Sequence, residues 1–273
     1  MIKKKGLLRG LSPTTIKTYS YVVSKFFRIC GKQPYKITKN DLENYLLKLL
    51  ENGTPGNTIN VQLNALMFFF EQVLNRRLTI NLNYSKVPQR MPEFLTQEEC
   101  VRFFSCIHNP KHKLMITLLY SAGLRISELL HLKIKDFQFD QNYGWVRQGK
   151  GRKDRIFIIS PKIKDNLLPY ITQNNLQAED VLFHNHRKTM SAQTVRMIIK
   201  KAITLADISK NVHPHALRHS FATHLLENGY AVTDLQPLLG HSKIETTLIY
   251  THLAQPKLLN IKSPYDFLPE QFL

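Results

Sequence analysis

The sequence predicts a mainly α-helical protein with a small antiparallel β-sheet, divided into two domains. The chain has 273 residues, and domains commonly contain about 100 to 200 residues. Apolar residues recur at helical spacing along most of the chain. Signals for strands and turns gather in one stretch, residues 137–159. The sheet should therefore belong to the second domain, and the first domain should be entirely helical.

Three helices are expected in the first domain. Ser12, followed by a proline, is typical of an N-cap and first helical turn. Thr38 and Asp41 resemble a capping box at the start of a second helix. Residues 58–74 are so rich in apolar side chains, Val61 among them, that we expect a central helix buried on all sides.

The boundary between the domains is expected where two prolines disfavour a continuous helix. The stretch NLNYSKVPQRMPEF contains Pro88 and Pro92. We therefore assign residues 1–84 to a helical domain, 85–94 to a linker and 95–273 to the second domain.

The second domain should begin with another capping box, formed by Thr96 and Glu99. Residues 137–159 then combine β-favouring side chains with the turn sequences QNYG and GKGRKD, which predicts the small antiparallel sheet. Helix-start signals return further along the chain, at Ser160 with Pro161, Ser191, Pro214, and Ser242 with Glu245.

The charge of the chain indicates an extended anionic partner. With 38 Lys and Arg against 20 Asp and Glu, the formal net charge is +18, so nucleic acid is the first candidate. No stretch approaches the roughly 18 to 20 consecutive apolar residues that span a bilayer. The start MIKKKGLLRG lacks the apolar run of a signal peptide, and three cysteines without a CxxC pair suit a reducing compartment. We expect a cytoplasmic protein without a membrane segment.

Several residues fit attack on a phosphodiester without a metal. Such attack requires cations for the non-bridging oxygens, a nucleophile, and an acid for the departing oxygen. Arg125 and Arg218 are candidate phosphate ligands, because the rigid guanidinium fork matches phosphate oxygens. If a helix begins at Pro214, His215 shares a helix face with Arg218, and free N–H groups at that end favour an anion.

Each of these features also has an ordinary structural explanation. A lone arginine is usually a surface charge, a basic turn is usually a solvated hairpin, and a tyrosine between Ile249 and Thr251 is usually half-buried packing. His215 and His219, four residues apart, could form a metal pair, but the central glutamate of a zinc-protease helix is absent. No metal site is expected. Structural or hydrogen-bonding roles are assigned to His213, His219, His224 and His252.

Together the motifs resemble those of the tyrosine recombinases, also called phage integrases, and especially the short Xer-type members. The most specific are HALRH at 215–219, LLGH ending at His241, and Tyr250 nine residues later. SAGLRISELLHLKIKDF resembles the first arginine motif of the family, and VPQRMPEFLT resembles its interdomain linker. The resemblance covers nearly the whole chain.

The resemblance implies six catalytic residues: Arg125, Lys150, His215, Arg218, His241 and Tyr250. Tyr250 would be the nucleophile, and Arg125 and Arg218 would hold the phosphate. Lys150 would protonate the departing 5′ oxygen. No metal or other cofactor would take part.

The other two catalytic residues are histidines, and Glu128 has a supporting role. His215 would assist proton transfer, His241 would donate a hydrogen bond to a non-bridging phosphate oxygen, and Glu128 would orient its neighbours. Pro237 departs from the family pattern by removing a backbone donor from the helix before LLGH. DNA contacts from the basic hairpin are expected at Arg152, Lys153 and Arg155.

The implied fold is a C-shaped clamp around duplex DNA, made of a helical core-binding domain and an α+β catalytic domain. Four protomers on two paired sites would exchange strands through 3′-phosphotyrosyl intermediates and a Holliday junction, either to resolve chromosome dimers or to move a mobile element. The alternatives are DNA relaxation like that of a type IB topoisomerase, a non-catalytic DNA-binding protein, and a metal-dependent nuclease.

The segment after the nucleophile should also dock on a protein surface. Residues 255–273 are too apolar for a free terminus in water. They could pack on their own domain, whereas the resemblance favours docking on a neighbouring protomer.

Overall fold

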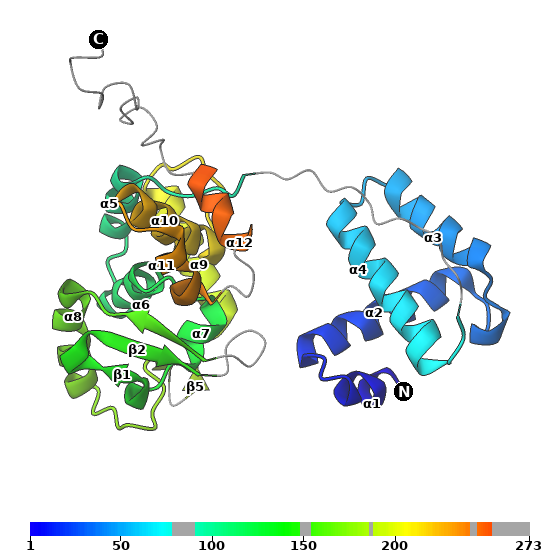
Figure 1. Ribbon diagram of the computed structural model, residues 1–273, viewed down its shortest axis with the longest axis horizontal. Helices are drawn as coiled ribbons and strands as arrows, with labels where there is room; N and C mark the ends of the chain where they lie inside the picture. The colour runs from blue at the N-terminus through cyan, green and yellow to red at the C-terminus, as the bar shows by residue number, and fades with distance from the viewer. Residues whose placement is uncertain (78–90, 148–153, 186–187, 241–244, 253–273) are drawn as a thin grey trace, which may run out of the picture. The chain divides into compact units, whose positions relative to one another are not determined.

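The computed structural model describes residues 1–77, 91–147, 154–185, 188–240 and 245–252 (Figure 1). The chain separates into two compact units, Met1–Arg90 and Met91–Leu273. This division falls within the predicted linker, residues 85–94. Because residues 78–90 lie outside the described part, the three domain boundaries remain predictions.

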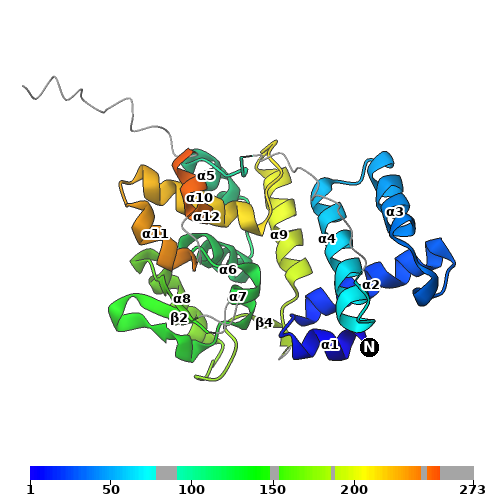
Figure 2. The ribbon, with the colours of Figure 1, turned by 45° about the vertical axis from the view of Figure 1, so that its right-hand side comes forward.

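The described part of the first unit is a helical bundle. Its elements are α1 (Ile2–Leu8), α2 (Pro13–Cys30), η1 (Pro34–Lys36), α3 (Lys39–Glu51), α4 (Gly56–Met67) and the π-helical turn η2 (Phe68–Val73). The expected N-caps are present: Ser12 accepts a hydrogen bond from the Thr15 N–H at 3.1 Å, and Thr38 forms a full capping box with Asp41. Helices α2 and α4 pack along each other (Figure 2), and Phe26 of α2 and Phe70 of η2 are fully buried with their ring centroids 6.4 Å apart.

Two features of this unit differ from the sequence prediction. The basic leader forms helix α1, which packs on α2. Gly6 permits this close approach, because a Cβ there would lie 2.8 Å from Ile16 Cγ1. Helix α4 is not buried on all sides: Val61 is 41% exposed, while Leu63 and Leu66 face the core. The hydrophobic segment therefore has one solvent-facing edge.

The second unit contains a three-stranded antiparallel sheet of order β1-β2-β3, in which Tyr143 lies opposite Ile158 and Val146 opposite Arg155. The prediction of a mainly helical protein with a small antiparallel sheet is confirmed. Its elements are α5 (Gln97–Ser105), α6 (Pro110–Ser121), α7 (Ile126–His131), η3 (Ile134–Asp136), β1 (Phe137–Gln138), η4 (Phe139–Gln141), β2 (Tyr143–Val146), β3 (Arg155–Ile158), α8 (Pro161–Gln173), β4 (His184–Asn185), β5 (Lys188–Thr189), α9 (Ala192–Leu205), α10 (Pro214–Glu227), α11 (Val232–Leu239), α12 (Glu245–Leu248) and η5 (Ile249–His252).

Most helix starts in this unit follow from local sequence. Thr96 and Glu99 form the predicted capping box, Ser191 caps α9, and α10 begins at Pro214. The predicted cap at Ser242 lies outside the described residues. The short hairpin of β4 and β5 was not predicted, since its strands are only two residues long.

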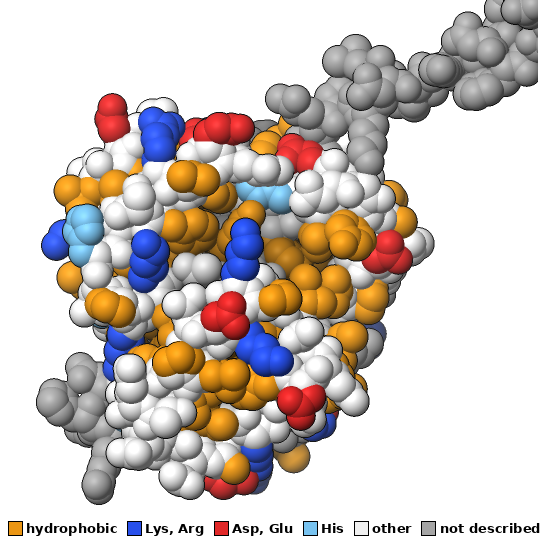
Figure 3. Space-filling model, turned by 90° about the vertical axis from the view of Figure 1, so that its left-hand side faces the viewer, with side chains coloured by type: hydrophobic (Ala, Val, Ile, Leu, Met, Phe, Trp, Pro, Cys, Tyr) orange, Lys and Arg blue, Asp and Glu red, His pale blue; other side chains and the backbone are white. Residues whose placement is uncertain are grey.

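The surface gives two further observations. None of the helices in the described ranges has both the length and the apolar character needed to cross a membrane. On the face shown in Figure 3, acidic side chains lie among basic and apolar ones, so the net charge of +18 is not concentrated on that face.

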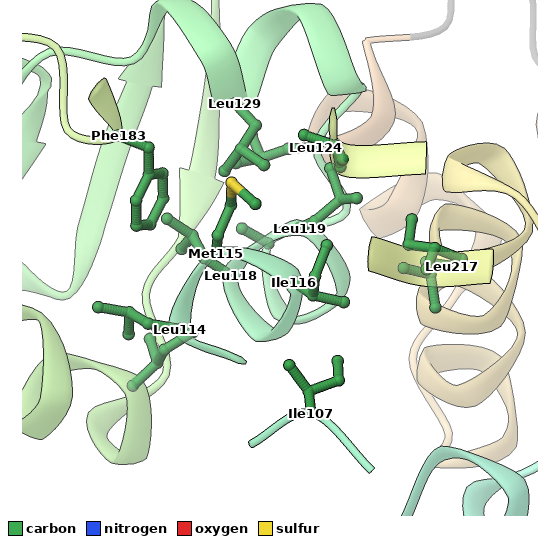
Figure 4. Close-up of a cluster of buried hydrophobic side chains, with 14 of the residues drawn as sticks. Ile107, Leu114, Met115, Ile116, Leu118, Leu119, Leu124, Leu129, Phe183 and Leu217 are labelled. Carbon is green, nitrogen blue, oxygen red and sulfur yellow. The ribbon is translucent and has the colours of Figure 1, made fainter. Parts of the chain in front are cut away.

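Helix α6 forms the centre of the apolar core and fixes the position of the functional residues. Met115, Leu118 and Leu119 are fully buried, and they pack with Leu124 and Leu217 from the segments that follow α6 and from α10 (Figure 4). The next residue after each of these last two leucines is a candidate phosphate ligand, Arg125 or Arg218. The core therefore anchors both arginines through their neighbours in sequence.

Candidate active site

Arg218 lies in the second turn of α10 and is almost completely buried, with 3% exposure. Its Nη1 donates to the Gly123 carbonyl at 2.6 Å, and its Nη2 donates to the Leu239 carbonyl. These bonds join α10 to the turn after α6 and to the end of α11. The guanidinium is therefore held in place by backbone acceptors from two other elements.

Arg125 is the N-cap residue of α7 and reaches the same backbone acceptor. Its Nη2 donates to the Leu239 carbonyl at 3.4 Å, and its Nη1 donates to Glu128 Oε1 at 2.6 Å. Since both arginines donate to one carbonyl oxygen, their guanidinium groups must lie side by side. The two candidate phosphate ligands are thus brought together although they are far apart in sequence.

Glu128 is the anionic centre of this group. Its Oε2 accepts from the Arg125 backbone N–H at 2.8 Å and from Arg155 Nη2 at 2.6 Å, and it lies 3.8 Å from Arg218 Nη1. Burial raises the pKa of this carboxyl, but the charge of Arg155 and the hydrogen bonds from Arg155 and Arg125 outweigh it, so the pKa lies below its ordinary value. Glu128 is ionised and orients three arginines.

Arg155 is not the surface DNA contact that the basic hairpin predicts. It is 7% exposed, and it donates to Glu128 and to the Leu238 carbonyl. Gly240 packs against it so closely that a Cβ on this glycine, at φ +58°, would lie 2.7 Å from Arg155 Cδ. The physical reason is strand alternation: Arg155 and the fully buried Phe157 point to the same face of β3. Arg155 therefore ties β3 to the end of α11.

The group carries more positive than negative charge. Arg125, Arg155 and Arg218 surround the single carboxylate of Glu128, which leaves a net charge of +2 by adding three and subtracting one. Burial, and then the charges of Arg125 and Arg155, lower the pKa of Arg218 to about 9. An anion entering this place would relieve the repulsion, as expected of a phosphate site.

Tyr250 lies on η5 and is 1% exposed. Its ring belongs to the same buried cluster as Phe221, Leu235 and Leu239. Helix α11 packs against α10 and α12 (Figure 2), and η5, which carries Tyr250, packs against α10 and α12. Burial raises the pKa of its hydroxyl, and the charges of Arg218 and Arg125 act in the opposite direction. The tyrosine is thus within the field of both candidate phosphate ligands.

The hydroxyl of Tyr250 lies 3.0 Å from His219 Nδ1. Sequence reasoning gave His219 only a structural or hydrogen-bonding role. The available signal was helical spacing, since His219 follows His215 by four residues and shares its helix face. Which tyrosine it would meet could not be read from the sequence, because η5 is brought to α10 by tertiary packing.

His215 is exposed and lines an open cleft of about 690 Å³ together with Arg125 and Glu128. Val146 and Arg147, at the end of β2, line the same cleft. The cleft therefore connects the charged group to solvent and to the base of the β2–β3 hairpin. The remaining predicted site residues lie outside the described part of the chain: Lys150, Arg152, Lys153 and His241.

Two family models cover most of the sequence. Residues 93–256 match the phage integrase family, and residues 2–80 match the N-terminal SAM-like domain of phage integrases. The chain belongs to the phage integrase family. It is a site-specific tyrosine recombinase, an enzyme that cleaves and rejoins DNA.

Individual relatives agree with this assignment. The recombinase is 37% identical to the tyrosine recombinase XerA of Pyrococcus horikoshii over 255 residues, which covers 92% of this chain and 87% of that protein. The crystal structure of a XerA recombinase covers 95% of this chain and 94% of its own, with 31% identity and a TM-score of 0.57. A XerH recombinase bound to a palindromic difH substrate, in a post-cleavage complex, has a TM-score of 0.74 over 94% of this chain and 82% of its own; at 24% identity it shows the fold alone.

Proposed function

We propose that Tyr250 is the nucleophile of this recombinase and that Arg125 and Arg218 hold the scissile phosphate. The observation that carries the proposal is the position of Leu239. Its carbonyl accepts from both arginines, and its side chain lies in the buried cluster that contains Tyr250. One residue thus links the two phosphate ligands to the tyrosine.

The reaction follows from this arrangement. Two non-bridging phosphate oxygens replace the backbone carbonyls as acceptors for the arginines. The Tyr250 oxygen then attacks phosphorus, the bond to the 5′ oxygen breaks, and a 3′-phosphotyrosyl intermediate forms. We assign protonation of the 5′ oxygen to Lys150, and we assign a hydrogen bond to the phosphate to His241. Attack by a 5′ hydroxyl of the partner strand reverses the step without metal or other cofactor.

Glu128 and His215 complete the proposed site. Glu128 fixes the arginines, since it pairs with Arg125 and Arg155 at 2.6 Å each. We assign assistance in proton transfer to His215, which lines the cleft together with Arg125.

We place DNA along the open cleft and the β2–β3 hairpin. Arg147 lies at the base of this hairpin, where it packs over Trp145 and lines the cleft. We propose that Arg152 and Lys153 contact DNA from the hairpin. Arg155 is buried and is not among the proposed DNA contacts. The mixed charges of the face in Figure 3 make that face a poor alternative.

At the level of the assembly, we propose that the enzyme works in the cytoplasm as a tetramer on two paired specific duplex sites. Strands are exchanged through a Holliday junction, for chromosome dimer resolution or for integration and excision. Residues 1–84 form the core-binding domain, and residues 255–273, outside the described part, dock on a neighbouring protomer. A related integrase was solved as a dimer on its core site, which supports assembly on DNA.

The test replaces Tyr250 by Phe, which removes the attacking oxygen and little packing. On a suicide substrate nicked near the cleavage point, wild-type protein should give a covalent protein–DNA band on a denaturing gel. The variant should give none while still binding a single site in a gel shift. A covalent band from Tyr250→Phe would overturn the assignment.

A further inference from the structure

Arg155 lies among the groups that hold the two proposed phosphate ligands. Its Nη2 donates at 2.6 Å to Glu128 Oε2, on the carboxylate that also pairs with Arg125. The same nitrogen lies 3.5 Å from the Gly123 carbonyl, which accepts from Arg218. Arg155 therefore shares one acceptor group with each of the two arginines.

A third contact of Arg155 lies at the end of α11. The last carbonyls of a helix have no partner within the helix, and arginines supply partners here. Arg155 Nη1 donates to the Leu238 carbonyl, next to the Leu239 carbonyl that accepts from both proposed phosphate ligands. Helix α11 then ends at Gly240, which leaves room for the Arg155 stem because it has no Cβ. Arg155 thus holds the end of the helix that carries the shared acceptor.

The backbone of Arg155 is itself fixed by the sheet. Arg155 lies opposite Val146 in the β2–β3 pair, and Phe157, two residues along β3, is fully buried. The Phe157 ring packs on Phe137 of β1, with the centroids 5.6 Å apart. The side chain of Arg155 is only 6% exposed. A rigid sheet therefore carries an arginine that reaches the phosphate ligands through other groups.

Charge balance alone does not account for this third arginine. Arg125 already pairs with Glu128 at 2.6 Å, so the carboxylate has a counter-charge without Arg155. The charge of Arg155 adds to the repulsion on Arg218, whose pKa is lowered by burial and then by the charges of Arg125 and Arg155. Arg155 therefore has an electrostatic cost that its contacts must offset.

We propose that Arg155 is a positioning residue for the phosphate site: it fixes Glu128 and the end of α11, and through them the spacing of the two phosphate ligands. The inference rests on the proposed roles of Arg125 and Arg218. In this role Arg155 touches neither the phosphate nor the nucleophile. Its loss acts on the geometry of the site, where a displacement of about 1 Å can slow the reaction about 10²-fold.

The test variant is Arg155→Lys, which keeps the positive charge but loses the planar fork that reaches several acceptors at once. Phe157→Leu is the matched control, because it disturbs the same face of β3 and belongs to the apolar core. Melting curves and single-site gel shifts measure how much of each protein is folded and binds DNA. Single-turnover cleavage of the suicide substrate is then measured below the melting temperature of both variants.

The decisive readout is a second substrate, in which a methyl group replaces one non-bridging oxygen of the scissile phosphate. This methylphosphonate carries no charge, so its reaction depends much less on the spacing of the arginines. On the ordinary phosphate Arg155→Lys should be about 10²-fold slower than wild type, and on the methylphosphonate the deficit should shrink to less than about tenfold. Any deficit of Phe157→Leu should be the same on both substrates.

An equal deficit of Arg155→Lys on the two substrates, or no deficit, would overturn the positioning role, since a general loss of structure slows both reactions alike. If Arg155→Lys does not fold, Gly240→Ala takes its place. The added Cβ would lie 2.7 Å from Arg155 Cδ and displace the guanidinium, so the same dependence on substrate is expected. A deficit of Gly240→Ala that is equal on both substrates would count against the role in the same way.

Arg125→Ala separates this inference from the proposed function. Its deficit should also shrink on the methylphosphonate, because it removes a phosphate ligand directly. If it does not shrink, Arg125 is not a phosphate ligand and the proposed function fails. If the deficit of Arg125→Ala shrinks and that of Arg155→Lys does not, only the role of Arg155 fails.

Discussion

The second unit contains two buried regions of opposite chemistry. Around α6 the buried side chains are apolar, and Met115, Leu118 and Leu119 are fully excluded from water. In the charged group, Glu128 and Arg218 are also buried, at 8% and 3% exposure. The first region stabilises the fold by removing apolar surface from water. The second buries charges with an excess of +2, which is costly without an anion. The interior of the second unit therefore combines an apolar region that stabilises the fold with a charged region suited to binding a phosphate.

Replacing Glu128 by Gln should have the largest effect on stability. It leaves the buried Arg155 and Arg218 and the partly buried Arg125 without their counter-charge, and breaking a buried pair costs about 3–5 kcal/mol. Chemical denaturation should show this loss near pH 7. Because the folded pKa of Glu128 is lowered, its stabilisation is present above the unfolded pKa and is lost as pH falls through the folded pKa. An unfolding free energy equal to that of wild type would contradict the description of Glu128 as the anionic centre.

Replacing Leu119 by Ala should lower the unfolding free energy by about 2–5 kcal/mol, because the side chain is fully buried and leaves a cavity. The cleavage rate per folded molecule should fall much less than the stability, because Leu119 belongs to the apolar core and not to the charged group. Denaturation curves together with single-turnover cleavage below the melting temperature would check both parts. A specific loss of cleavage in the folded variant would show that the two regions are not separable in this way.

Binding of an anion should have the smallest effect and should be confined to the charged region. Sulfate resembles the scissile phosphate and should stabilise the protein by about 1.4 kcal/mol at ten times its Kd. Arg218→Ala removes one ligand and should respond less than wild type when both are melted in sulfate and in chloride of equal ionic strength. Equal stabilisation of the two proteins would mean that sulfate acts on the whole surface and not at this site.

The two regions also differ in how far the sequence predicts them. Helix starts such as Thr38 and Thr96 were predicted because a cap depends on residues three apart. The apolar segments were predicted from their periodicity, although the exposure of Val61 was not. Helix α1 was missed because its packing depends on a close approach at Gly6 that periodicity does not show.

The sequence predicted the residue types of the charged region but not the hydrogen bonds that connect them. The motifs pointed to Arg125 and Arg218, yet the acceptor that joins them is the backbone carbonyl of Leu239, which no side-chain pattern reveals. Arg155 was assigned to the DNA surface from its basic neighbours. Strand alternation with Phe157 carried the correct signal, because it places the arginine on the buried face.

The central claim is that the excess positive charge holds a phosphate for attack by Tyr250. The most direct measurement traps the covalent complex on a suicide substrate, digests protein and DNA, and locates the attached nucleotide by mass spectrometry. The account predicts a nucleotide 3′-phosphate linked to the Tyr250 oxygen, and a loss of this adduct in Arg218→Ala. A nucleotide attached to any other residue, or an adduct formed at the wild-type rate by Arg218→Ala, would contradict it.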